Sequence, residues 1–208
     1  MAVNLPVHVL GAGGHAKVVI STLLAAGFEI AAVYDDAISK WGQVCLGFHI
    51  CGPISELSTV ETIAAVVAVG HNRTRQAIVE RFKNVQWVTV VHPRAWVHPS
   101  VTIGAGTVVF AGAIIQPETH IGEHCIINTG ATVDHECWIG DYVHIAPGVH
   151  LAGNVNIHTG ALLGISSAVL PGIEIGDWTT VGAGGVIIHN LPGHSKAIGV
   201  PAKIKNKE

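Results

Sequence analysis

The chain has 208 residues, of which 49% are hydrophobic, 12% are charged and 25 are glycine. This length fits one large or two small domains, and the glycine content favours β-structure with tight turns over a helical bundle. A net charge of -3, with no stretch that mixes basic and aromatic residues, argues against a nucleic-acid groove. The most apolar run, residues 63–69, is far shorter than the roughly 20 residues that span a bilayer, and no signal peptide is recognisable. We therefore expect a cytoplasmic protein.

The first half of the chain alternates short β-branched runs with helical patterns. Strands are predicted at residues 7–10, 30–33, 64–69 and 85–91, and helices at 15–26 and 72–82. This alternation is typical of a small α/β unit with a parallel sheet. We assign residues 1–93 to a Rossmann-like α/β domain.

A glycine-rich turn follows the first predicted strand. The segment Gly11-Ala12-Gly13-Gly14-His15-Ala16 matches the loose fingerprint GxGxx(G/A), and Asp35 follows about 20 residues later. Glycines at these positions let the backbone approach a phosphate at the helix N-terminus. Taken alone the motif indicates NAD. A domain of about 92 residues is short of two mononucleotide halves, however, so a single nucleotide fits better.

From Val97 the pattern changes to a period of six. An aliphatic residue recurs at every sixth position as far as Ile187, and a mostly small residue such as Ala113 or Cys125 follows four positions later. This period is not close to a multiple of 3.6, and regular Asn-Gly or Asp-Gly hairpin signals are absent. The pattern predicts a triangular parallel solenoid over residues 94–190, with five coils and residues 18 apart stacked at about 4.8 Å.

One corner of this prism carries the candidate chemistry. Stacking by 18 aligns Pro99, Pro117, His135, Gly153 and Pro171. Proline favours tight corners, so the interruption by His135 and Gly153 is informative. It puts a base next to a backbone N–H without a side chain, the pair that acyl transfer uses to deprotonate a nucleophile and hold an oxyanion.

Two acidic residues flank this histidine. Either Asp134 or Glu136 could hold the imidazole of His135 in one tautomer and raise its basicity. The alternative is a solvated surface histidine, in a chain that has 14 histidines. The four cysteines, Cys45, Cys51, Cys125 and Cys137, show no metal-binding spacing, and we expect reduced, buried thiols.

Several segments together resemble one family. They are Asn128-Thr129-Gly130, Asp134-His135-Glu136, Ala152-Gly153-Asn154, the terminal Gly199-Val200-Pro201-Ala202-Lys203 and the N-terminal Gly-Ala-Gly-Gly-His-Ala-Lys. They resemble the nucleotide-amino-sugar acetyltransferases, which include bacillosamine-pathway and perosamine N-acetyltransferases and are similar to sialic acid O-acetyltransferases. The resemblance covers essentially the whole chain. It implies that the solenoid is a left-handed parallel β-helix of hexapeptide repeats.

The resemblance also implies an activity and a site. The expected reaction transfers an acetyl group from acetyl-CoA to the 4-amino group of a nucleotide-linked 4-amino-4,6-dideoxy sugar, directly in a ternary complex and without a metal. His135 would be the general base, assisted by Glu136, and Asn128, His144 and Gly153 would line the acetyl-CoA site. The family is trimeric, with active sites between neighbouring prisms. His144 would then act across the interface from His135, or it is structural.

Residues of the N-terminal domain are implied as contacts of the nucleotide sugar, which would carry a UDP, dTDP or GDP group. They are Gly11, Gly13, Gly14, His15, Lys17, Asp35, Asp36 and Asn72. His71 stands where some relatives carry a second asparagine, which puts the nucleobase contacts there in doubt. Lys17 and Arg75 could instead be solvated charges on their helices.

The predicted prism lacks cations for the phosphates of CoA. Between Ala95 and Ser195 there is not one lysine or arginine, and the nearest cations are Lys196, Lys203, Lys205 and Lys207. Phosphates need cationic or amide partners. We therefore expect the tail, residues 191–208, to fold back along the upper coils so that Lys203 or a neighbouring lysine meets a CoA phosphate. The alternative is a solvated, disordered terminus.

Three other functions share features with this sequence. A γ-type carbonic anhydrase is also a trimeric left-handed β-helix with histidines, but it binds zinc and lacks the N-terminal nucleotide-binding domain. An O-acetyltransferase acting on sialic acid or a related sugar would suit the same histidine base. A non-catalytic trimer that binds sugar nucleotides would bind nucleotide without turning over acetyl-CoA.

Overall fold

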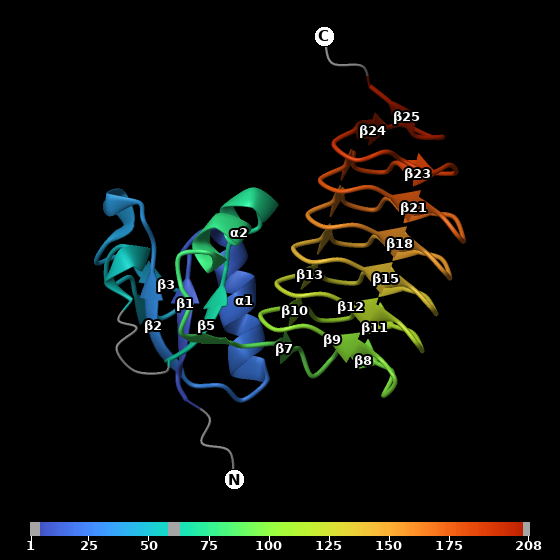
Figure 1. Ribbon diagram of the computed structural model, residues 1–208. Helices are drawn as coiled ribbons and strands as arrows, with labels where there is room; N and C mark the ends of the chain where they lie inside the picture. The colour runs from blue at the N-terminus through green and yellow to red at the C-terminus, as the bar shows by residue number, and fades with distance from the viewer. Residues whose placement is uncertain (1–4, 58–62, 206–208) are drawn as a thin grey trace.

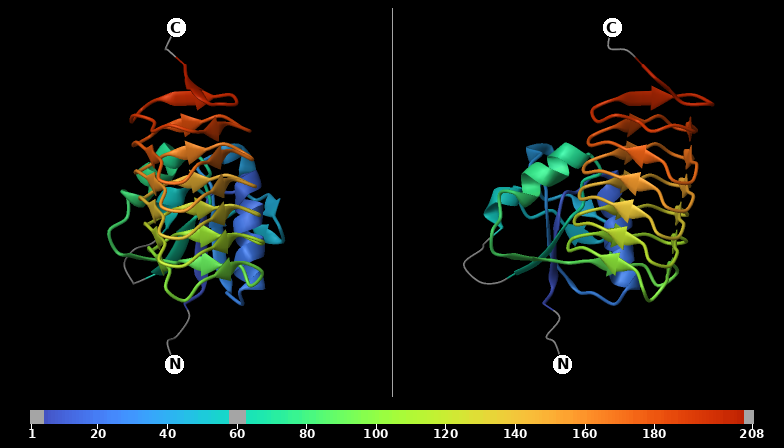
Figure 2. Two further views of the ribbon diagram at one scale, coloured as in Figure 1. Left: turned by 90° about the vertical axis from the view of Figure 1, so that its right-hand side faces the viewer. Right: turned by 45° about the vertical axis from the view of Figure 1, so that its right-hand side comes forward.

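The computed structural model describes residues 5–57 and 63–205, which form an N-terminal α/β domain and a C-terminal prism (Figure 1). The prism is a stack of coils that rises beside the α/β domain and extends well above it (Figure 2). Within the described ranges, no helix combines the length and the apolar character that a membrane span requires.

A four-stranded parallel sheet in the order β2-β1-β5-β6 forms the centre of the N-terminal domain. Its strands are β1 (Val7–Leu10), β2 (Ile30–Tyr34), β5 (Ile63–Val67) and β6 (Val85–Trp87). The other elements of the domain are α1 (Gly14–Ala25), α2 (Asn72–Val79), the short helices η1 (Ile38–Lys40) and η2 (Ile54–Glu56), and the hairpin strands β3 (Val44–Cys45) and β4 (Phe48–His49). Since β2 and β5 lie on opposite sides of β1, the carboxyl ends of β1 and β5 border a topological switch point, where open α/β sheets bind ligands.

The passage from this sheet to the prism differs from the sequence prediction. Residues 85–91, expected as one strand, form two: β6 ends at Trp87, and β7 (Val90–Val91) pairs with β10 of the prism. Thr89 lies at the crossing, and its hydroxyl donates to the Gly104 carbonyl at 2.8 Å. The six-residue repeat thus begins one hexad before Val97. The domain division at residue 93 stays a prediction.

The prism is the left-handed parallel β-helix that the repeat and the resemblance predicted. Its three sides are sheets of two-residue strands in which residues 18 apart pair in register, as Ile121 does with Ile139. The first side contains β7, β10 (Val108–Val109), β13 (Ile126–Ile127), β16 (His144–Ile145), β19 (Leu162–Leu163) and β22 (Thr180–Val181). The second contains β8 (Trp96–Val97), β11 (Ile114–Ile115), β14 (Thr132–Val133), β17 (His150–Leu151), β20 (Ala168–Val169) and β23 (Val186–Ile187). The third contains β9 (Thr102–Ile103), β12 (His120–Ile121), β15 (Trp138–Ile139), β18 (Asn156–Ile157) and β21 (Glu174–Ile175).

Corners of the prism are turned by residues with positive φ. Along the corner between the second and third sides, Glu118, Glu136 and Asn154 have φ of 61°, 58° and 58°. Pro117 precedes Glu118, and a proline followed by a residue with positive φ is the arrangement of a type II turn. The proline column read from the sequence therefore marks the first central position of each turn, and His135 occupies that position in its coil.

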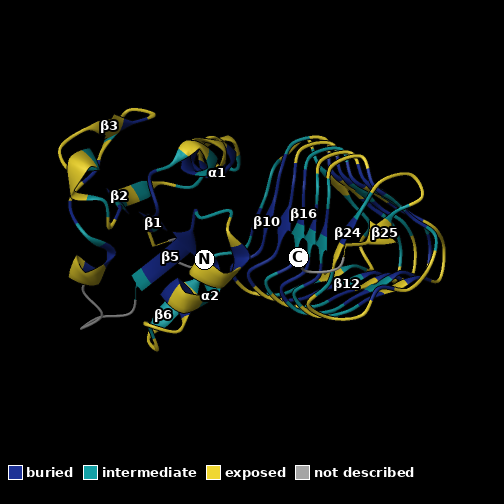
Figure 3. Ribbon diagram, turned by 90° about the horizontal axis from the view of Figure 1, so that it is seen from above, coloured by how far each residue is buried: buried dark blue, intermediate teal, exposed yellow. Residues whose placement is uncertain are grey.

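The second residue of each two-residue strand points into the prism and is packed against residues of the coils above and below. Ile121, Ile139 and Ile157 are examples of such residues, and each is fully buried. Seen from above, buried residues also run along the side of the coils that faces the N-terminal domain (Figure 3). Cys125 and Cys137 lie in this core, where burial raises the pKa of their thiols to about 12 and about 11, so both stay protonated near neutral pH. Cys51 is exposed, contrary to the expectation that all the thiols are buried, because it lies in the surface loop after β4.

The described part of the tail continues the prism. Strand β24 (Lys196–Ile198) pairs with β22 at the top of the first side, and β25 (Lys203–Ile204) turns back antiparallel to β24. Ala197 is fully buried in the prism core. Lys203 thus sits on the uppermost layer of the first side, while Lys207 lies outside the described residues.

Candidate active site

His135 lies in the turn between β14 and β15, at the corner of the second and third sides. Its ring lies against Gly153 of the next coil: a Cβ built on Gly153 would stand 2.6 Å from Nε2 and 3.0 Å from Nδ1. Any side chain at position 153 would displace this imidazole. Among the backbone hydrogen bonds of the described residues, none is donated by the Gly153 N–H.

The two acidic neighbours of His135 have different contacts. The Glu136 carboxylate lies 2.9 Å from Nδ1 of His135, whereas the Asp134 carboxylate accepts the backbone N–H of His135 at 2.9 Å. Because a carboxylate only accepts, Glu136 fixes the neutral imidazole as the Nδ1–H tautomer and leaves the Nε2 lone pair unoccupied. Asp134 instead braces the turn. The side chains of His135 and Glu136 are 56% and 59% exposed, so this corner is open to solvent in the single chain.

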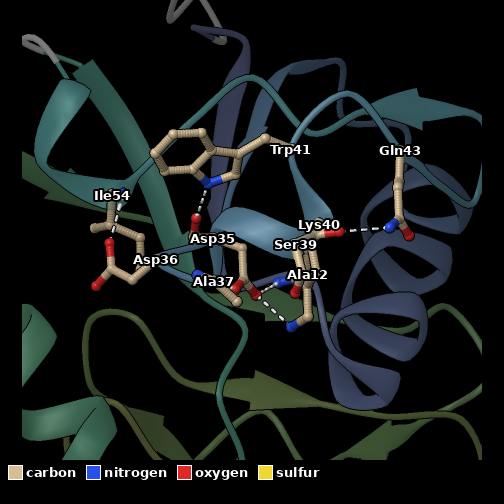
Figure 4. Close-up of polar contacts among 9 residues, drawn as sticks. All are labelled: Ala12, Asp35, Asp36, Ala37, Ser39, Lys40, Trp41, Gln43 and Ile54. Carbon is tan, nitrogen blue, oxygen red and sulfur yellow. Dashed lines mark hydrogen bonds and ion pairs between the residues drawn. The ribbon is translucent and has the colours of Figure 1, made fainter.

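A carboxylate braces the glycine-rich turn of the N-terminal domain. Gly13 caps α1, and Gly11 has φ of +114° with no room for a side chain, because a Cβ would come within 2.9 Å of Val69. The Asp35 carboxylate accepts the N–H of Ala12 at 2.7 Å (Figure 4). The turn is therefore held at the carboxyl end of β1, and the first helical residue of α1 follows it directly.

Asp35 is itself held ionised. Burial opposes its charge, but the Lys40 ammonium at 2.8 Å and the N–H groups of Ala37 and Ala12 outweigh burial and lower the pKa of the carboxyl. Its oxygens are thus largely occupied within the protein. A contact from Asp35 to a nucleotide stays a prediction.

The other predicted contacts of the nucleotide sugar border the same edge of the sheet. Asp36 accepts the Ile54 N–H at 2.8 Å and pairs with Arg81 at 3.1 Å, across the loop that follows β2. Gly14 and Lys17 are exposed on the first turns of α1. None of these groups is sequestered in the protein core.

The carboxyl ends of β1 and β5, with His15 and Gly70, face His144 on the first side of the prism, and we call this junction the crevice. Nε2 of His144 lies 3.1 Å from the Asn128 amide nitrogen, and its Nδ1 lies 3.2 Å from the Gly70 carbonyl. The Asn128 amide is oriented by the Thr129 N–H, which donates to its oxygen at 2.8 Å. Asn128 therefore donates to Nε2, and Nδ1 carries the proton that goes to Gly70. His144 is neutral, with both ring nitrogens engaged.

His15 completes this contact. Its ring lies 6.1 Å from that of His144 and 5.5 Å from that of Phe110, and the same two histidine rings flank Gly70. Burial, followed by the charge of Arg75, lowers the pKa of His15 to about 4 and that of His144 to about 3. Both imidazoles are therefore neutral near pH 7.

Asn72 faces the prism. Its amide nitrogen donates to the Gly160 and Ala161 carbonyls, each at 3.0 Å, and its oxygen accepts from Arg75 at 2.9 Å. A hollow of about 130 Å³ opens beside it, between the first turn of α2 and the prism, and Gly70 forms part of its lining. Arg75 is buried, so the interpretation of this residue as a solvated helix charge is wrong.

The predicted site residues thus form two groups on different sides of the prism. Asn128 and His144 lie with His15 and the glycine-rich turn, where the N-terminal domain covers the first side (Figure 3). His135, Glu136 and Gly153 lie at the corner of the other two sides. Within one chain, the packed core of the prism separates the crevice from His135.

Comparisons with known proteins find matches to both the N-terminal domain and the prism. The family described as PglD N-terminal domain matches residues 6–82, and the bacterial transferase hexapeptide family, described as six repeats, matches residues 118–153. The crystal structure of PerB from Caulobacter crescentus, in complex with CoA and GDP-perosamine, is 42% identical with a TM-score of 0.90, and the match covers 97% of each chain.

The chain belongs to the nucleotide-amino-sugar N-acetyltransferases.

A second solved acetyltransferase is also similar over nearly the whole chain. The acetyltransferase domain of PglB from Neisseria gonorrhoeae is 36% identical with a TM-score of 0.90, over 97% of this chain and 100% of that chain. Curated relatives are matched only in part: an uncharacterised protein of Acanthamoeba polyphaga mimivirus is 38% identical over 108 residues, which are 52% of this chain and 22% of that protein.

The neutral histidines at the junction predict a loss of stability in acid. His15, His124 and His144 have folded pKa values of about 4, about 4 and about 3, against 6.5 for an unperturbed histidine, chiefly because they are buried. Between these values the unfolded chain binds protons that the folded chain does not. The free energy of unfolding therefore falls as the pH drops from about 6.5 to about 4, by up to about 1.4 kcal/mol per pH unit for each histidine.

This prediction is checked by denaturant unfolding at a series of pH values. His124→Phe should flatten the slope between about pH 6 and pH 4.5 by up to one proton, because the ring of His124 packs against Trp87 and Tyr142 and a phenyl ring can replace it. The same change at the exposed His49 is the control. A slope that is identical in wild type and His124→Phe would contradict the assignment.

Proposed function

We propose that this protein transfers the acetyl group of acetyl-CoA to the 4-amino group of a nucleotide-linked 4-amino-4,6-dideoxy sugar, with His135 as general base. The observation that carries the proposal is the corner arrangement: Nδ1 of His135 is held by Glu136, and its ring lies against the glycine at position 153. An imidazole with an unoccupied Nε2 next to a backbone donor is suited to acyl transfer.

The proposed reaction is a direct attack. The lone pair of the sugar amine adds to the thioester carbonyl, while Nε2 of His135 takes a proton from the amine. The resulting oxyanion accepts a hydrogen bond from the Gly153 N–H. The tetrahedral intermediate then collapses, the C–S bond breaks, and the CoA sulfur leaves with the proton returned by His135. Glu136 stabilises the imidazolium between these steps.

The crevice of the N-terminal domain is the proposed site of the nucleotide sugar. Gly13 and Gly14 open the start of α1, where backbone N–H groups and the helix dipole favour a phosphate. PerB, whose crystal structure contains GDP-perosamine and CoA, aligns with this chain over 97% of its length. The four-stranded sheet of this domain is short of the two mononucleotide halves of a dinucleotide fold, which favours a single nucleotide.

The proposal requires a homotrimer with active sites shared between copies. In one chain His135 points away from the crevice, and the prism core lies between them. Trp96 and Ile114 pair on the second side and are 48% and 39% exposed, an apolar surface that a second prism would cover. A neighbouring copy would then bring its His135 to the crevice and His144 of this copy. The contact would also exclude water from the His135–Glu136 pair, which is open to solvent in the single chain.

The terminal hairpin is the proposed contact of the CoA phosphates. Lys196 lies opposite Lys205 in the pairing of β24 with β25, and Lys203 is two residues from Lys205, so the three ammonium groups share one side of the hairpin. Like charges directly opposite each other are destabilising, and a bound phosphate would relieve this repulsion. The hairpin stands three strand spacings, about 14 Å, above His144 on the same side of the prism.

The relatives favour nitrogen over oxygen as the acceptor atom. The structures similar over the whole chain include PerB, which holds an amino sugar linked to GDP, whereas an O-acetyltransferase would need only the same base. Acetyl-CoA and nucleotide sugars are made in the cytoplasm, which is therefore the proposed location of the reaction. Turnover of acetyl-CoA with GDP-, UDP- and dTDP-linked 4-amino sugars separates these possibilities from a non-catalytic trimer.

Replacing the base tests the mechanism. His135→Ala should lower kcat by on the order of 10²- to 10⁴-fold, the usual contribution of a general base, with binding of acetyl-CoA unchanged. The measurement is steady-state acetyl transfer, followed as free CoA, together with calorimetric titration of acetyl-CoA. His49→Ala, a change of an exposed histidine in the N-terminal domain, is the control. Near wild-type turnover by His135→Ala would refute the assignment.

Replacing a lysine of the hairpin tests the phosphate contact. Lys203→Met should raise KM for acetyl-CoA by about 10-fold, the effect of losing one charge-assisted hydrogen bond, and should leave KM for 3′-dephospho-acetyl-CoA nearly unchanged. Lys83→Met, a change of an exposed lysine in the N-terminal domain, is the control. If the variant and wild type have the same KM for both thioesters, backbone amides hold the phosphates and Lys203 does not.

A further inference from the structure

Arg75 is a buried cation at the seam between the two domains. It lies in α2, its exposed fraction is 1%, and burial is the main cause that lowers its pKa to about 10, so it remains protonated near pH 7. Among the described residues, no carboxylate pairs with it. Its charge is satisfied by backbone carbonyls and one amide.

The guanidinium holds both domains at once. On the prism, Nε donates to the His124 carbonyl and Nη2 to the Tyr142 carbonyl, each at 2.7 Å. On the N-terminal domain, Nη1 donates to the Val69 carbonyl at 3.1 Å and the Gly70 carbonyl at 3.3 Å. Residues 124 and 142 turn the same corner in successive coils, and residues 69–70 form the loop after β5 at the switch point.

Asn72 extends this contact to a third coil. Its oxygen accepts from Nη2 of Arg75, and its amide donates to the carbonyls of Gly160 and Ala161. The corner residues His124, Tyr142 and Gly160 are spaced by 18, so the two side chains span three consecutive coils. The planar guanidinium fixes the direction of each bond, which an apolar contact does not do.

Energy alone does not account for a charge in this position. Removing a guanidinium from water is costly, and apolar residues of similar volume often stabilise such a seam equally well or better. What the fork of Arg75 adds is a defined distance and orientation between the prism and the loop. The Gly70 carbonyl of that loop lies 3.2 Å from Nδ1 of His144, and the His15 ring lies beside Gly70, so the position of the loop affects the geometry of the crevice.

We propose that Arg75 is a positioning residue for the transfer reaction: its guanidinium, which bonds two coils of the prism directly and a third through Asn72, fixes the crevice loop, residues 69–70, against the prism and so sets where the acceptor sugar is held. This inference rests on the proposed function. Because reacting atoms must meet within about 3–3.5 Å, a displacement of about 1 Å can cost about 10²-fold in rate without changing the binding of either substrate.

The test is Arg75→Lys, which retains the charge but replaces the planar fork with a single ammonium. We expect turnover to slow by about 10- to 100-fold, while KM for acetyl-CoA and the Kd for the nucleoside diphosphate of the sugar donor that wild type uses stay within about threefold. Hydrogen exchange of the peptide that covers residues 66–72 should become faster. Arg94→Lys, the same change at an exposed arginine of the first coil, should alter none of these values.

Two results would overturn the inference: a turnover rate within about threefold of wild type, or parallel losses of kcat, both affinities and melting temperature, which would indicate a scaffold role only. If Arg75→Lys does not fold, the test uses Asn72→Ala, which removes the bonds to the third coil. This variant should also lower kcat while binding of both ligands is unchanged, but by a smaller factor than Arg75→Lys. A wild-type kcat in Asn72→Ala would overturn the inference. If wild type acetylates none of the sugars, the proposed function fails. The hydrogen exchange of residues 66–72, compared between Arg75→Lys and Arg94→Lys, then decides whether Arg75 fixes the loop.

Discussion

The structure depends on the parallel pairing of residues 18 apart. Each coil of the prism repeats the backbone of the coil below, so a change of residue type at one coil alters a side chain while the path of the chain is kept. At the corner of the second and third sides, proline gives way to His135 and then to Gly153 at the same turn position. The imidazole can lie over Gly153 because the repeat supplies the turn and glycine leaves the space. The candidate base is thus placed by the periodicity of the core.

The buried contacts of Arg75 determine how the N-terminal domain is placed against the prism. They seat the N-terminal domain on the first side of the prism, with the carboxyl ends of β1 and β5 directed at His144 and Asn128. This arrangement assigns the nucleotide crevice to one side and His135 to the opposite corner. A single chain therefore holds both parts of the proposed active site but cannot bring them together. Under the proposed function, assembly of copies is part of the chemistry, and the junction that seats each domain is part of the active-site geometry.

The fold of the prism and the candidate base could be predicted from the sequence, because the six-residue period reflects the backbone geometry that every coil repeats. The hexads of residues 97–187 predict which positions face the prism core, and the column through Pro117 and His135 identifies the candidate base. The residues alone left Asp134 and Glu136 open, and only the family resemblance favoured Glu136, because the contact with His135 depends on the positive φ of Glu136 and the direction of its side chain. The sequence also could not predict the role of Arg75, whose partners are carbonyls at residues 69, 70, 124 and 142. Backbone carbonyls belong to every residue type and leave no mark in the sequence.

The most direct test of the central claim, that crevice and base come from different copies, is complementation between two inactive variants. His135→Ala lacks the base, and Gly13→Asp puts a negative charge where the phosphate is expected. Each variant alone should be inactive, and co-expression should restore up to about a quarter of wild-type turnover, because random trimers pair an intact crevice with an intact His135 at about one interface in four. Co-expressed trimers that remain as inactive as the separate variants would contradict the account and assign both groups to a single chain.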